Sequence, residues 1–175
     1  MRAILVVLLS TLLLSGCVSD ESKGLCPSAA ILVPTSALTV FRENGPQDPS
    51  GELYSVWMTN ANTSCDFDKK QHSTLSEVRL MLAAKRAPTG EDASYRVPYF
   101  VTVTHGGNRI LTKKLYFANV HFPAGESVVN FEETVAGVDI KFDRNAKVGE
   151  YQILAGFQLT HSQLEYNTQN NKYAP

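Results

Sequence analysis

The chain has 175 residues, a formal net charge of −1 and 43% hydrophobic residues. This length fits a single domain with one core. The charge is too close to neutral for a nucleic-acid-binding surface, so we expect no nucleic-acid partner. It also predicts no polybasic patch, so any attachment to a bilayer would come from another feature of the chain.

Residues 1–16 have the layout of a secretory signal peptide. Arg2 gives a basic start, and the apolar run that follows is shorter than the about 20 residues that span a bilayer. The run ends in Leu14-Ser15-Gly16-Cys17, which resembles the lipobox of bacterial lipoproteins. The resemblance implies cleavage before Cys17, a lipid on the Cys17 sulfur and acylation of the new amino terminus.

The residue after Cys17 indicates which of the two bacterial membranes would hold the protein. Lipoproteins kept at the inner membrane usually carry Asp there, whereas this chain has Val18. By that resemblance we expect the protein at the outer membrane, facing the periplasm, with triacylated Cys17 as a stable anchor. Residues 17–25 then form a lipidated tether, because they are mostly small and polar.

The three cysteines divide into one lipid site and one pair. With Cys17 lipidated, Cys26 and Cys65 remain, and an oxidising periplasm favours a disulfide between them. The rival interpretations are two buried free thiols or a metal site. No CxxC or His-rich spacing accompanies the two residues, so we predict the disulfide.

The first half of the expected domain, 26–160, is composed of short β-strands. Expected strands are 29–33, 37–42 and 53–61, with loops at 43–51 and 62–74. Residues 75–87 are ambiguous, because Leu75, Val78 and Leu82 would share a helix face. The alternation from Val78 to Ala84 fits a strand instead. We predict a strand, since the neighbouring segments are strands.

The second half shows the alternation more clearly. The strands we expect are 96–104, 109–117, 127–135, 137–143 and 150–159, with a further short segment at 120–126 that ends in a turn. His105-Gly106-Gly107-Asn108 is typical of a hairpin turn. About seven short strands at regular spacing predict an all-β fold, an antiparallel β-sandwich, with a small barrel as the alternative.

A corner motif favours an immunoglobulin-like sandwich. Lys147-Val148-Gly149-Glu150-Tyr151 resembles the corner before a late strand in immunoglobulin-like and fibronectin-like domains. The resemblance implies that the Tyr151 hydroxyl bonds back to the chain. The positions of Cys26, Trp57 and Cys65 do not match the Cys-Trp-Cys pattern of antibody domains.

The C-terminal segment, 161–175, changes character. Thr160 and Gln163 have the spacing of a capping box, which predicts a short helix of one or two turns from Ser162 to Asn167. The remaining residues are rich in Asn and Gln, and we expect a frayed tail. The ending GFQLTHSQLEYN resembles bacterial lipoproteins of a family without an assigned activity, so no activity carries over.

No catalytic motif is evident, so we predict no enzyme, no catalytic residue and no cofactor. The chain has neither G-x-S-x-G nor S-x-x-K. Its histidines lack metal-binding spacing; they are His72, His105, His121 and His161. Asp66-Phe67-Asp68 resembles the opening of a calcium loop, but lysines follow where oxygen ligands belong. Glu132 and Glu133 should point to opposite faces of one strand.

These observations favour a non-catalytic envelope lipoprotein that binds or scaffolds another component. The membrane is one partner, through the N-terminal lipid, and the other would be an unknown envelope protein or glycan. A glycan- or peptidoglycan-binding module is the alternative, and a periplasmic hydrolase is a third hypothesis. Phe100 and Tyr116 would support glycan binding if both were exposed, but we expect them to be covered.

Overall fold

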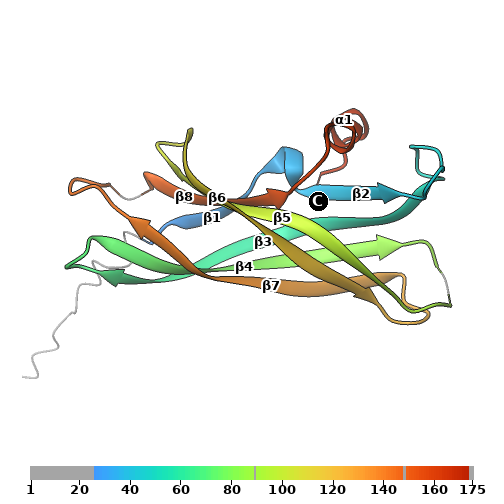
Figure 1. The fold of residues 1–175 in the computed structure, drawn as a ribbon, viewed down its shortest axis with the longest axis horizontal. Coiled ribbons are helices and arrows are strands. Elements are labelled where there is room, and N and C mark those ends of the chain that lie inside the picture. Colours follow the sequence, from blue (N-terminus) through green and yellow to red (C-terminus); the bar gives the residue numbers. More distant parts are fainter. Residues whose placement is uncertain (1–25, 89, 148, 174–175) are drawn as a thin grey trace, which may run out of the picture.

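Two four-stranded β-sheets face each other in this protein (Figure 1). The computed structural model describes residues 26–88, 90–147 and 149–173, which include eight strands and a helix near the C-terminus. The predicted β-sandwich is therefore confirmed, with eight strands in place of about seven. The expected signal peptide, Cys17 and the tether as far as residue 25 lie outside the described residues.

The first sheet, sheet A, has the strand order β1-β8-β5-β6. Its strands are β1 (Ser28–Ile31), β8 (Tyr151–Phe157), β5 (Ala93–His105) and β6 (Arg109–Phe122). β5 and β6 form the predicted hairpin, whose turn uses positive φ angles at Gly106 and Gly107. β1 pairs with β8 in parallel. A short 3-10 helix, η2 (Val33–Thr35), follows β1.

The second sheet, sheet B, has the strand order β2-β3-β4-β7, and its pairings are antiparallel. Its strands are β2 (Ala37–Phe41), β3 (Glu52–Asp68), β4 (Ser73–Arg86) and β7 (Val128–Lys141). The strand prediction for 75–87 is thus confirmed, and the helical alternative is wrong. Val78, Leu80 and Leu82 alternate into the core between the two sheets, as strand geometry requires.

β3 is longer than the sequence pattern indicated, so the predicted loop over 62–74 is wrong for most of its length. Asn62, Ser64 and Asp66 are exposed, whereas Thr63 and Cys65 are half-buried between them. This is the period of two that a strand requires. The polar composition concealed the alternation, and a tight turn follows at 69–72.

β6 and β7 are also continuous where we expected breaks. β6 runs through residues 118 and 119 without interruption. β7 passes residue 136 by a bulge, in which Ala136 and Gly137 lie opposite the single residue Glu77. Gly137 supplies a φ of 74°, which a residue with a side chain adopts only at a cost.

The helix α1 (His161–Asn170) packs along β2, the edge strand of sheet B. The predicted capping box is confirmed: the Thr160 hydroxyl accepts from the Gln163 N–H, and the Gln163 side chain accepts from the Thr160 N–H. Asn167 Nδ2 donates to the Ala37 carbonyl at 2.8 Å, which holds the helix against the sheet. The helix extends beyond the expected one or two turns.

The predicted disulfide between Cys26 and Cys65 is confirmed, with the two Cα atoms 5.8 Å apart. It joins the chain just before β1 of sheet A to β3 of sheet B. The Thr63 hydroxyl adds a hydrogen bond to the Pro27 carbonyl at 2.7 Å. Together these contacts fix the point at which the chain enters the sandwich.

We predict that the double variant Cys26→Ser/Cys65→Ser unfolds with a free energy lower by about 3 to 4 kcal/mol, because the disulfide closes a loop of 39 residues. Urea unfolding of the oxidised proteins measures the difference. Ser64→Ala, an exposed position on the same strand, is the matched control and should leave the midpoint unchanged. Equal midpoints for the double variant and the control would contradict the prediction.

Candidate functional site: a polar cleft beside the C-terminal helix

The four histidines lie apart, each with its own neighbour. His105 is 3.9 Å from Glu150, His121 is 3.5 Å from Asp92, and His161 is 3.3 Å from Glu165. His72 occupies the β3–β4 turn. Within residues 26–173, as far as they are described, no three His, Cys, Asp or Glu side chains are grouped to hold a metal ion.

The structure gives Asp68 and Glu133, two of the acidic residues noted in the sequence, hydrogen-bond partners within the protein. Asp68 accepts hydrogen bonds from the N–H groups of Lys70 and Gln71, and so orders the β3–β4 turn. Glu132 is exposed, whereas Glu133 points to the inner side of sheet B, where the Tyr99 hydroxyl hydrogen-bonds to it. The prediction of opposite faces is confirmed, but Glu133 is more than a solvated edge residue.

The two aromatic residues singled out from the sequence do not form an exposed pair. Phe100 is only 6% exposed, and the Lys113 ammonium lies 4.3 Å from its ring centroid. Tyr116 lies on the inner face of sheet A, stacked on Tyr99 at 5.5 Å between centroids. The expectation that both are covered therefore agrees with their surroundings.

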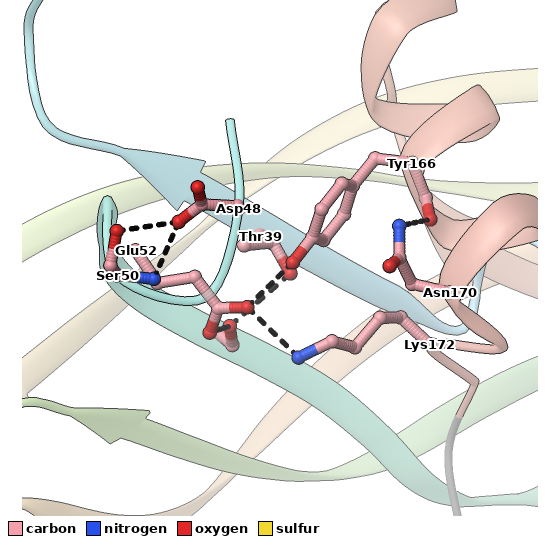
Figure 2. A network of polar contacts seen from close by, with 8 residues as sticks. Thr39, Asp48, Ser50, Glu52, Tyr166, Asn170 and Lys172 are labelled. Carbon is pink, nitrogen blue, oxygen red and sulfur yellow. Dashed lines mark hydrogen bonds and ion pairs between the residues drawn. The ribbon is translucent and has the colours of Figure 1, made fainter. Parts of the chain in front are cut away.

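A carboxylate network under α1 is the most connected polar group among the described residues (Figure 2). Glu52, at the start of β3, accepts hydrogen bonds through Oε1 from the Tyr166 hydroxyl at 2.8 Å and from Lys172 Nζ at 2.9 Å. Its Oε2 accepts from the Ser55 hydroxyl at 3.2 Å. Thr39 extends the network, because its hydroxyl lies 3.2 Å from that of Ser55.

The network keeps the Glu52 carboxyl group ionised. Burial alone would raise the pKa of this carboxyl, but the hydrogen bonds from Lys172 and Tyr166 and the Lys172 charge outweigh it and hold the pKa below its ordinary value. Burial and the bond to Glu52 raise the pKa of Tyr166 to about 12, so its hydroxyl stays a donor. Glu133 behaves in the opposite way, since burial raises its pKa despite bonds from Asn119 and Tyr99.

A cleft of about 410 Å³ opens beside this network. Trp57 and Lys85 line it from neighbouring strands of sheet B, and Glu52, Lys172 and Pro49 form another part of its wall. A volume of this size can hold a small ligand or one unit of a polymer. We define these five residues as the polar cleft.

The Arg86 side chain holds the end of β4 in place beside the polar cleft. Its guanidinium donates to the carbonyls of Glu126, Glu91 and Pro123 at 3.0, 2.6 and 3.2 Å. Because its guanidinium is already bonded to three carbonyls, we assign Arg86 a structural role in the wall of the cleft and not a role in ligand binding. The groups that remain for a ligand are the half-buried Trp57 ring and the charges of Lys85, Lys172 and Glu52.

Comparison with protein-family models, curated proteins and solved structures finds no match to this chain. No helix in the described part of the chain is long and apolar enough to cross a membrane.

The polar cleft could not be found from the sequence. Glu52 is separated from Tyr166 by 114 residues and from Lys172 by 120. Both partners lie in the segment that was expected to end in a frayed tail. The one available signal was the capping box at Thr160, which predicted an ordered helix but not the surface on which it packs.

We predict that Glu52→Gln and Glu133→Gln change stability at pH 7 in opposite directions. A depressed pKa means that ionised Glu52 stabilises the fold above pH 4.5, its ordinary pKa, so Glu52→Gln should cost about 1 kcal/mol at pH 7. A raised pKa means that ionised Glu133 opposes folding, so Glu133→Gln should not destabilise at pH 7 and should raise the unfolding midpoint.

Urea unfolding at pH 7 and pH 4 measures both effects. Each difference from the parent protein should shrink at pH 4, because both carboxyls are then largely protonated in the unfolded chain. A loss for Glu52→Gln that is the same at both pH values would contradict the assignment of a charged Glu52.

Proposed function

We propose that the protein is a lipid-anchored envelope lipoprotein, held by Cys17 at the periplasmic face of the outer membrane, and that its sandwich is a non-catalytic binding or scaffolding module. The observation that carries the anchor is the distribution of the cysteines. Cys26 and Cys65 are bonded to each other, which leaves Cys17 of the three for the lipid. Its place after Leu14-Ser15-Gly16 and the choice of Val18 support the location.

An immunoglobulin-like sandwich is the architecture we propose for this module. It is supported by the corner at Gly149 and Tyr151, because the Tyr151 hydroxyl accepts a hydrogen bond from the Asp143 N–H at 3.2 Å. The strand order departs from that class in one respect. The last strand, β8, pairs with β5 and not with β7, whereas the last two strands of an immunoglobulin sheet are neighbours.

The anchor is tested by Cys17→Ser in the producing cell. We predict that the variant is no longer labelled by a radioactive fatty acid and is recovered in the soluble envelope fraction. Ser64→Ala is the matched control, since it changes an exposed residue and leaves the lipid site and the disulfide in place. Continued fatty-acid labelling of Cys17→Ser, or its cleavage at the same site, would show that the lipoprotein assignment is wrong.

Glycan or peptidoglycan binding is the second candidate, and the polar cleft favours it. A half-buried Trp57 ring provides a stacking surface, while Lys85, Lys172 and Glu52 provide donors and an acceptor beside it. This combination suits a sugar ring with polar substituents.

We predict for this candidate that purified sacculi retain the protein. Trp57→Ala should reduce retention about tenfold or more, because the variant loses one stacked aromatic contact and the burial of its ring. Phe117→Ala is the control, because Phe117 is an exposed aromatic residue on sheet A. Absence of retention by sacculi, or equal losses for the two variants, would leave binding or scaffolding of a protein as the function.

A further inference from the structure

The outer face of sheet A carries exposed apolar side chains along β6. Ile110 is 63% exposed, Leu115 51% and Phe117 45%. Cross-strand register places Lys113 and Arg96 on the same face, opposite Thr102 and Asn119. The Arg96 guanidinium lies 3.8 Å from the Phe117 ring centroid. We define the basic apolar face by five residues: Ile110, Lys113, Leu115 and Phe117 of β6, and Arg96 of β5.

Charge is divided unequally between the two sheets. The strands of sheet A contain no Asp or Glu, and their basic residues are Arg96, Arg109, Lys113 and Lys114. The acidic strand residues belong to sheet B, and they are Glu52, Asp66, Asp68, Glu77, Glu132, Glu133 and Asp139. The strands of sheet B also contain four basic residues, Arg79, Lys85, Arg86 and Lys141, against seven acidic ones. The near-neutral charge of the whole chain, which predicted no basic patch, therefore averages over an acid-free sheet A and a sheet B with an excess of acidic strand residues.

The chain enters sheet A at the end where β6 begins. Ser28 lies beside Gln152, Gln152 beside Thr104, and Thr104 beside Ile110, so these residues form one row across the sheet. Three strand spacings make this row about 15 Å long. The nine steps from Cys17 to Cys26 span at most about 30 Å. A lipid on Cys17 would therefore hold this end of sheet A close to the bilayer.

We propose that the basic apolar face docks on a phospholipid surface with anionic headgroups, which orients the sandwich on the membrane. This inference rests on the proposed function for the tether, but the face itself is defined by charge and exposure. Ile110, Leu115 and Phe117 would enter the headgroup region, while the basic groups meet the lipid phosphates.

A second copy of this chain fits the face less well. Contact between the basic apolar faces of two copies would bring Lys113 and Arg96 of one copy near the same residues of the other, and like charges brought together across an interface are destabilising. The excess of positive charge thus favours an anionic surface over a dimer.

The test uses the chain from residue 18, which contains all described elements and lacks the lipid site. It is sedimented with vesicles of phosphatidylglycerol and phosphatidylethanolamine, and with vesicles of phosphatidylcholine alone. We expect binding to the anionic vesicles only, decreasing as salt is raised. Arg96→Glu/Lys113→Glu should weaken binding about 30-fold or more, since each basic residue near such a surface contributes about fivefold. Leu115→Ser should weaken it at constant charge.

Lys69→Glu/Lys70→Glu is the matched control, because it makes the same charge change at two exposed basic residues in the β3–β4 turn, outside the basic apolar face. Equal weakening by the two double variants, or equal binding to both vesicle types, would overturn the proposal. Unchanged vesicle binding by Arg96→Glu/Lys113→Glu would overturn it as well. Because no lipid is attached, these results are independent of the Cys17→Ser test.

Discussion

The Cys26–Cys65 disulfide determines how the two sheets and the chain entry are related. It joins the chain just before β1 of sheet A to β3 of sheet B, at one side of the sandwich. β6 and β7, at the other side, are linked by the Glu133 side chain, to which the Asn119 N–H of β6 hydrogen-bonds. The disulfide thereby fixes the end of the sandwich at which a tether must leave, and hence which surfaces an anchored molecule can turn towards a bilayer.

The outer faces of the two sheets are chemically different, and this difference predicts which face of an anchored molecule lies on the membrane. Sheet A presents basic and apolar side chains on its outer face, without strand acids. Sheet B carries the helix α1, the acidic residues and the polar cleft. With sheet A on the membrane, the cleft faces away from it, where an envelope protein or glycan could reach it.

Local patterns in the sequence predicted much of the fold. Alternation identified most strands, the spacing of Thr160 and Gln163 identified the helix start, and parity identified the disulfide. The extension of β3 through Asp68 was missed because polar residues alternate there without an apolar signal. The network of Glu52 and the charge asymmetry required the tertiary structure, since they depend on helix docking and on which strands share a sheet.

The most direct test of this account is photocrosslinking in cells that make the lipidated protein. A photoreactive amino acid at Leu115 samples the outer face of sheet A, and one at Met81 (39% exposed) samples the outer face of sheet B. The account predicts phospholipid adducts at position 115 and none at position 81. Phospholipid adducts at both positions to the same extent, or a protein adduct in place of lipid at position 115, would contradict it.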